Sequence, residues 1–241
     1  MFKGAIRTMV LVIGCMLAPY GVVAETLDSE TTQIVMLGTG TPNPFPDRSG
    51  PSVAIVVNNE PYLIDFGPGV VRQASAMSPE YGGSVEGLAV EKIKHAFLTH
   101  LHSDHSVGLP ALILTAWTVG RDEPLKLFGP EGAKHMADKV LEAYEEDIRY
   151  RLYSEQPANN EGWRVETHEI RNTGLVFEDD NVKVEAFRVP HGSWPEAWGY
   201  RFTTPDTVIV ISGDTAPSDV LKQFSQGADV LIHEVYSEEG F

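Results

Sequence analysis

Short apolar runs, alternating or continuous, are spread along the chain and predict β-strands. They cover residues 33–37, 53–57, 62–65, 96–98, 182–189, 208–211 and 230–232. Runs 53–57 and 62–65 flank Asn58 and Asn59, which predicts a hairpin. Helical patterns cover residues 68–77, 104–117, 132–152 and 219–224. Helices interleaved with paired antiparallel strands fit one domain with an α+β fold, a four-layer αββα sandwich.

The segment 132–152 has an apolar residue every four positions, from Met136 through Tyr144 to Leu152. This spacing predicts one amphipathic helix that lies on a sheet, with its tyrosines packed against the domain. Ser218 is a suitable N-cap for the helix 219–224.

Four ligand-type side chains follow the strand 96–98 within six residues: His100, His102, Asp104 and His105. In an extended chain, side chains at positions i and i+2 point the same way, so His100 and His102 can bind one ion together. Asp104 and His105 lie past the strand, where a turn can direct them to a second ion. Imidazole and carboxylate donors without sulfur suit zinc, and also manganese or iron.

Three further strands end in residues of the same kind. His191 follows the run 182–189, Asp214 follows 208–211, and His233-Glu234 follows 230–232. Side chains gathered at the ends of several strands predict one site at one rim of the sheets. Asp65, at the end of the run 62–65, either orients a ligand histidine or caps the helix 68–77; the sequence leaves both roles open.

These motifs resemble those of metallo-β-lactamase-fold hydrolases. The resemblance rests on His100-x-His102-x-Asp104-His105, on His191, on the segment 212–215 (Ser-Gly-Asp-Thr) and on His233-Glu234, and it covers the chain from about residue 33 onward. The amino-acid sequence around these motifs is most similar to that of ribonuclease Z and its arylsulfatase-like relatives.

The resemblance implies a role for each residue. It assigns His100, His102 and His191 to a first ion, Asp104 and His105 to a second, and Asp214 to a bridge between the two, with Zn²⁺ the expected metal. Asp104 and His233 are the candidate catalytic residues, and His233 would assist proton transfer without binding metal.

Two departures from the family pattern bear on function. The family has a further second-site histidine downstream of the His-Glu motif, and residues 235–241 contain none, so we interpret 25–241 as a hydrolase domain that is incomplete at its C-terminus. Bacterial ribonuclease Z enzymes typically carry a long tRNA-binding arm after the Gly-Tyr-Arg segment. Here only residues 202–211 separate that segment from Ser212, so the arm is absent.

Charge and the N-terminus change the expected substrate. The chain has 18 Lys and Arg against 34 Asp and Glu, a net charge of −16, which disfavours a polyanionic partner. Residues 1–24 have the basic start, apolar run and small-residue end of a signal peptide, which predicts a periplasmic or secreted protein with no membrane span after cleavage. Cys15, the only cysteine, lies in a lipobox-like sequence that offers lipid anchoring as an alternative.

We therefore predict a metal-dependent hydrolase, with two zinc ions in the complete protein, that cleaves small anionic phosphodiesters or sulfate esters with a metal-activated water. The alternatives are a ribonuclease Z-like endonuclease for tRNA 3′ ends, a lactonase or thioesterase, and a metal-binding protein without turnover. Trp194, Trp198 and Tyr200 follow His191 and either line a pocket for an aryl or sugar group or cover the edge of the core. The oligomeric state stays open.

Overall fold

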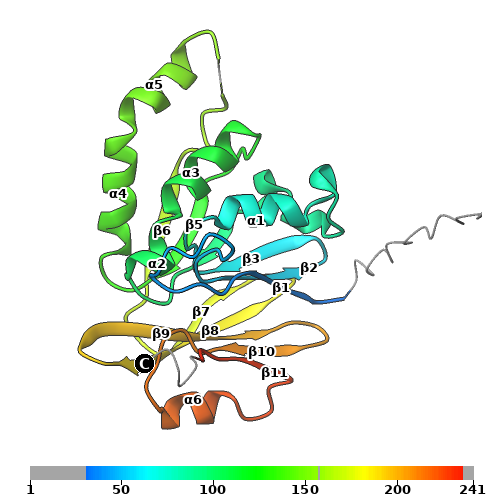
Figure 1. The fold of residues 1–241 in the computed structure, drawn as a ribbon, viewed down its shortest axis with the longest axis vertical. Helices are drawn as coiled ribbons and strands as arrows, with labels where there is room; N and C mark the ends of the chain where they lie inside the picture. Colours follow the sequence, from blue (N-terminus) through cyan, green and yellow to red (C-terminus); the bar gives the residue numbers. More distant parts are fainter. Residues whose placement is uncertain (1–30, 157, 236–241) are drawn as a thin grey trace, which may run out of the picture.

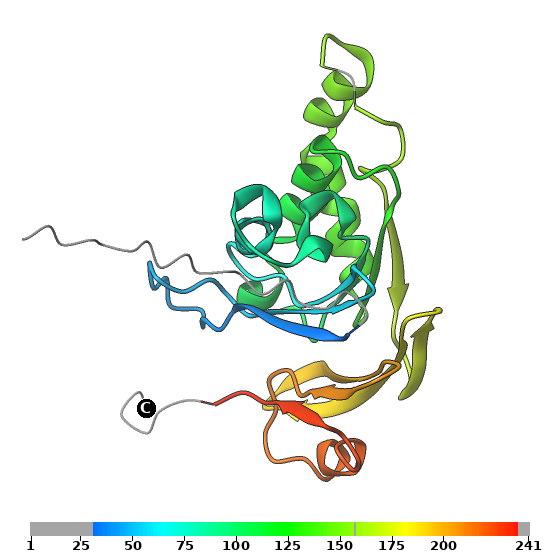
Figure 2. The same ribbon diagram turned by 90° about the vertical axis from the view of Figure 1, so that its right-hand side faces the viewer.

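Two β-sheets face each other and carry helices on their outer sides in the computed structural model, which describes residues 31–156 and 158–235 (Figures 1 and 2). The strands are β1 (Gln33–Gly38), β2 (Ser52–Val57), β3 (Glu60–Ile64), β4 (His95–Phe97), β5 (Leu125–Gly129), β6 (Val165–Glu169), β7 (Gly174–Glu178), β8 (Lys183–His191), β9 (Trp194–Thr203), β10 (Val208–Ile211) and β11 (Val230–Ile232). The α-helices are α1 (Val70–Met77), α2 (Ser103–Ser106), α3 (Leu109–Thr118), α4 (Ala133–Ala143), α5 (Glu145–Tyr153) and α6 (Asp219–Phe224). Short 3₁₀ helices lie at η1 (Pro79–Tyr81), η2 (Glu86–Leu88) and η3 (Val90–Lys92).

The layers confirm the predicted αββα sandwich. Helices α1, α3 and α4 cover the outer side of the first sheet, and α6 covers the outer side of the second (Figure 1). The predicted signal peptide and the chain end at 236–241 lie outside the described residues. No helix in the described part of the chain is long and apolar enough to cross a bilayer.

Both sheets are mixed, whereas the sequence pattern predicted paired antiparallel strands. The first sheet has the order β1-β2-β3-β4-β5-β6; β1 to β3 are antiparallel, and β3 to β6 are parallel. The second has the order β11-β10-β9-β8-β7, with only β10 and β11 parallel. Long connections that contain helices separate β3 from β4, β4 from β5 and β5 from β6, and such crossovers bring successive strands into parallel pairs.

The predicted helix 132–152 is divided into two. Helix α4 packs on β5 and β6, but Tyr144 leaves the helical region at φ −106° and α5 then projects away from the sheets (Figure 1). Ile148 is the one buried residue of α5, and the exposed fractions are 43% for Tyr144, 53% for Tyr150 and 82% for Tyr153. The prediction that these tyrosines pack against the domain was wrong, because the sheet ends before the periodic pattern does.

Aromatic rings fill the space between the sheets. The Phe97 ring stacks on Phe128 at 4.9 Å and meets the edges of Tyr200 and Phe202 at 5.6 and 5.3 Å. Trp198 and Tyr200 are buried in this core, and the Tyr200 hydroxyl donates to the Leu98 carbonyl at 2.6 Å. Of the three aromatic residues after His191, these two therefore belong to the core, and they hold β9 against the strand that leads into His100.

Candidate metal centre

The loop after β4 and the short helix α2 carry the histidine run, and the surrounding backbone fixes their path. The amide of Trp198 donates to the Thr99 carbonyl at 2.9 Å, and the amide of Phe66 donates to the His105 carbonyl at 2.8 Å. A Cβ added to Gly67 would overlap the Asp104 carbonyl oxygen. Glycine at position 67 therefore lets the chain after β3 pass close to the turn that carries Asp104 and His105.

Four side chains from three strand ends converge on one point: His100, His102, His191 and Asp214. One potential ligand atom from each lies within 4.8 Å of all the others. His102 Nδ1 is 2.8 Å from His100 Nε2 and 3.2 Å from His191 Nε2, and Asp214 Oδ2 is 3.9 Å from both Nε2 atoms. Donor atoms around a tetrahedral zinc ion lie about 3.3 Å apart, so the spacing suits such an ion.

His105 and Asp104 form a second group beside the first. His105 Nε2 is 3.3 Å from Asp214 Oδ1 and 3.7 Å from Asp104 Oδ2. Asp214 thus faces the first group with one carboxylate oxygen and the second group with the other. This is the arrangement that the predicted bridging role requires. The structure brings all six predicted ligands together, in sets of four and three that share Asp214.

A buried carboxylate behind the cluster sets the tautomers of two histidines. Asp65 Oδ1 accepts the amide hydrogen of Thr99 at 2.7 Å, and Oδ2 accepts from the Thr99 hydroxyl at 2.9 Å and from His105 Nδ1 at 2.7 Å. Because the only hydroxyl hydrogen of Thr99 goes to Asp65, its Oγ1 must accept from His100 Nδ1, which is 3.0 Å away. Both histidines then hold hydrogen on Nδ1 and direct the Nε2 lone pair into the cluster when neutral.

These contacts decide the role of Asp65, which the sequence left open. Asp65 orients two of the predicted ligand histidines, and the N-cap of α1 is Gly69, with no side-chain cap. Thr99 is a residue of the site that the sequence did not indicate. Its place directly before His100 was the available signal, because a hydroxyl at that position can bridge a buried carboxylate and the imidazole.

The protonation state of His100 suits a cation, whereas His105 must lose a proton before it can bind one. Burial, together with the neighbouring His105, lowers the pKa of His100 to about 3. The imidazole of His100 is therefore neutral at pH 7 and keeps its lone pair. Burial would also lower the pKa of His105, but the carboxylates of Asp65 and Asp214 outweigh burial and raise it to about 10 in the metal-free protein.

The donor set also leaves a contact unsatisfied that a cation would satisfy. His102 Nδ1 faces two other ring nitrogens, and a single hydrogen on Nδ1 can serve only one of them. A cation between the three rings would accept a lone pair from each. The residues present therefore fit a metal ion.

His233 lies outside the cluster in the described contacts. Ser212 Oγ donates to the Gly213 carbonyl, so it accepts from His233 Nδ1 at 2.9 Å, and Nε2 of His233 remains available as a proton acceptor. The neighbouring Glu234 accepts the amide hydrogen of Thr215, which ties β11 to the loop of Asp214. His233 also lines a cavity of about 720 Å³ beside α6. Its predicted part in proton transfer stays a prediction.

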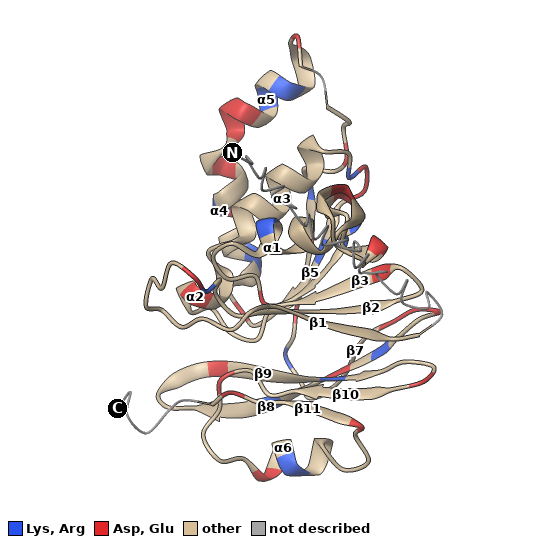
Figure 3. Cartoon of the chain, turned by 45° about the vertical axis from the view of Figure 1, so that its right-hand side comes forward, with Lys and Arg blue, Asp and Glu red and all other residues tan. Residues whose placement is uncertain are grey.

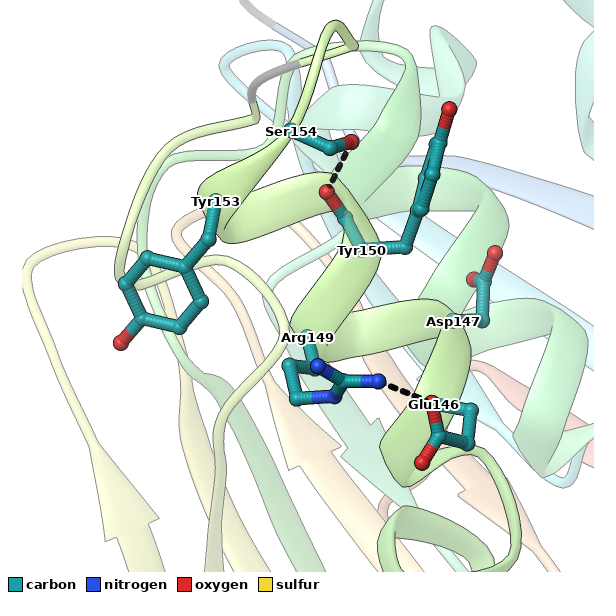
Figure 4. A pocket seen from close by; sticks show the side chains of 6 residues that line it. All are labelled: Glu146, Asp147, Arg149, Tyr150, Tyr153 and Ser154. Carbon is teal, nitrogen blue, oxygen red and sulfur yellow. Dashed lines mark hydrogen bonds and ion pairs between the residues drawn. The ribbon is translucent and has the colours of Figure 1, made fainter.

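A separate cavity of about 590 Å³ lies along α5 (Figure 4). Its lining comes only from α5 and the residue that follows it, with Tyr150 and Tyr153 extending outward and Arg149 paired to Glu146. None of the cluster residues contributes to it, so it has no part in the metal centre.

Comparison with known proteins agrees with this fold. The sequence profile of the Beta-lactamase superfamily domain matches residues 61–239. Ribonuclease Z of Mycobacterium bovis (strain BCG / Pasteur 1173P2) is 31% identical over 210 residues, which cover 86% of this chain and 71% of that protein. Among solved structures, human tRNase Z, short form, matches with a TM-score of 0.67 at 24% identity, over 87% of this chain and 80% of that chain. The metallo-beta-lactamase fold protein YhfI from Bacillus subtilis matches with a TM-score of 0.61 at 16% identity, over 83% and 70%.

The facing sheets and the His/Asp cluster at their rim define a metallo-β-lactamase-fold hydrolase. The chain belongs to the beta-lactamase superfamily, and ribonuclease Z enzymes are among its homologues. The family and the fold predicted from the sequence are thereby confirmed.

Proposed function

We propose that this protein is a metal-dependent phosphodiesterase whose reaction takes place at the cluster of His100, His102, His191 and Asp214. The observation that carries the proposal is the convergence of four ligand atoms within 4.8 Å, with a second group around His105 that shares Asp214. Phosphodiester bonds are the proposed target because the curated relatives are ribonucleases.

Zinc is the proposed metal, with one ion in each group. When bound, such ions lower the pKa of a water molecule and neutralise charge on a phosphoryl oxygen. The chain contributes orientation and charge. Asp65 and Thr99 hold the donor nitrogens of His100 and His105 in place. The Asp214 carboxylate, which faces both groups, would offset the repulsion between two bound cations.

His233 is the proposed proton carrier. Its Nδ1 hydrogen is held by Ser212, so Nε2 is the atom that can take up a proton and pass it to the leaving oxygen. This role requires Nε2 to face the bound substrate. Replacement of His233 tests it directly, because His233 is not among the proposed metal ligands.

The relatives favour RNA as the substrate over the small esters that charge and the export signal suggested. Ribonuclease Z and tRNase Z are the names of the similar proteins, and the match covers most of this chain. We therefore give an RNA 3′-end phosphodiester as the first candidate substrate.

A small phosphodiester is the second candidate, on two observations. Only residues 204–207 connect β9 to β10, so no arm extends from that hairpin. Many basic side chains on the helices are also paired with acidic neighbours, namely Lys134 with Asp138, Lys139 with Glu142, Arg149 with Glu146, Arg151 with Asp147 and Lys222 with Asp219. In Figure 3 the basic segments are scattered among acidic ones. Paired cations displace fewer counterions from an RNA backbone.

One experiment tests the function and separates the two substrates. The purified protein with Zn²⁺ or Mn²⁺ is given a 3′-extended precursor tRNA, bis(p-nitrophenyl) phosphate and an aryl sulfate, and the variant with His100 and His102 both changed to Ala is the control. We expect phosphodiester cleavage that the control lacks. Preference for precursor tRNA supports the first candidate, and preference for the small diester supports the second. Metal-loaded protein that cleaves neither refutes the proposal.

A further inference from the structure

The histidines of the cluster are not all held in the same way. His100 and His105 each have a hydrogen-bond partner behind the ring, Thr99 for His100 and Asp65 for His105. Among the described residues, no hydrogen bond reaches Nε2 of His102, although Nδ1 of that ring lies at the centre of the cluster. A ligand histidine usually has its second nitrogen fixed by a partner, and loss of that partner weakens metal binding. Another contact must therefore fix the position of the His102 ring.

The indole ring of Trp194 packs directly on His102. The centroids of the two rings are 4.0 Å apart with a 58° angle between the ring planes, and the indole lies 6.0 Å from the centroid of His100. Trp194 belongs to none of the hydrophobic clusters of the core and is partly exposed, in contrast to Trp198, which is 1% exposed. Among the described residues, its ring contacts are thus those with His100 and His102.

The same hairpin supplies a ligand and this indole. His191, the last residue of β8, pairs with Trp194, the first residue of β9, across a turn of two residues. Gly192 in that turn has a φ of +54°, a left-handed conformation that glycine adopts without strain. The hairpin therefore places the His191 imidazole and the Trp194 indole at the cluster as one unit.

We propose that Trp194 is a positioning residue for the metal centre, which holds the His102 imidazole by ring packing in place of a hydrogen bond. The proposal rests on the metal centre of the proposed function and is independent of the substrate. Packing between two tilted aromatic rings contributes a free energy that corresponds to about a 2- to 10-fold change in a binding constant. The Trp194→Ala variant should accordingly bind zinc about 2- to 10-fold more weakly, and Trp194→Phe should recover most of that loss.

The experiment measures zinc affinity by competition with a chromophoric chelator, and the visible absorption spectrum of the Co²⁺-substituted protein. Unchanged protein, Trp194→Ala and Trp194→Phe are compared with Trp163→Ala, which removes an indole that packs against Arg164 away from the cluster. We expect weaker zinc binding and an altered Co²⁺ spectrum for Trp194→Ala alone. Circular dichroism of the metal-free proteins verifies folding, and Trp194→Phe supplies the comparison if the alanine variant does not fold.

The outcomes separate this inference from the proposed function. The role of Trp194 would be overturned if Trp194→Ala had the same zinc affinity and the same Co²⁺ spectrum as the unchanged protein. It would also be overturned if the variant had a changed KM but an unchanged zinc affinity, because the indole would then contact substrate and not position a ligand. Weaker zinc binding by Trp194→Ala supports the inference even if the unchanged protein cleaves no phosphodiester, in which case only the proposed function fails. Absence of zinc binding in the unchanged protein would overturn both.

Discussion

Changing Asp65 to Asn should weaken zinc binding with little change in the shape of the site. Asn has the size of Asp and tolerates the left-handed backbone of this position, where φ is 56°. The amide, however, has one acceptor oxygen in place of two. If that oxygen keeps the Thr99 amide, the new NH₂ group meets two donors that Asp65 Oδ2 now accepts, the Thr99 hydroxyl and His105 Nδ1.

The metal-free variant can relieve this conflict by a change of tautomers. The Thr99 hydroxyl can turn so that its oxygen accepts from the new amide nitrogen at position 65. The hydroxyl hydrogen is then donated to His100 Nδ1, so the hydrogen of the His100 ring must move to Nε2, which faces the cluster. Zinc binding must reverse this shift at His100, so the cost falls on metal affinity. We expect a loss of about 10- to 100-fold, the size of effect seen when a partner behind a metal ligand is removed, or about 1.4–2.8 kcal/mol.

Chelator competition measures the zinc affinity directly. Thermal unfolding with and without Zn²⁺ measures it a second way, because zinc that binds more weakly raises the melting temperature less. Asp179→Asn is the matched control. Asp179 accepts from the Tyr62 hydroxyl at 2.7 Å and from the Val182 amide at 2.8 Å, and it contacts no cluster residue. Zinc affinity of Asp65→Asn within about twofold of the unchanged protein, or an equal loss in Asp179→Asn, would refute the tautomer argument.

Four further outcomes are expected. Changing His100 and His102 together to Ala should abolish binding at the first site, and full metal retention by elemental analysis would contradict that assignment. His233→Ala should keep the metal and lose at least about 100-fold in turnover; unchanged turnover would exclude it as the proton carrier. In metal-free protein, the raised pKa of His105 predicts stability that is fully present below about pH 6.5 and is lost as the pH rises toward about 10. Urea unfolding with a chelator should show this decline, which His105→Gln should lack. Residues 1–24 should direct export in a bacterial host; a full-length product that stays in the cytoplasm would contradict the predicted signal peptide.

Much of the site could be predicted because its chemistry is local in the sequence. The spacing of His100, His102, Asp104 and His105 depends only on strand and turn geometry, and strand ends marked His191 and Asp214 without knowledge of their partners. The hairpin at Asn58 was predictable for the same reason, since both asparagines of its turn adopt positive φ. Periodicity was less informative at Tyr144, because it shows which face of a helix is apolar and says nothing about where the supporting sheet ends.

The sequence by itself therefore determined the ligand types, the fold class and the family. Only the tertiary structure decided which atoms meet. Asp65 and Thr99 are 34 residues apart, and their contact exists because β3 and β4 are parallel neighbours that end at the same edge. Trp194 and His102 meet because the β8–β9 hairpin lies opposite that edge. The physical reason is the same in both cases. The residues that hold a predicted ligand histidine from behind come from strands that are distant in the sequence. The packing of those strands sets the distance between the residue and the histidine, and no local sequence pattern encodes that packing.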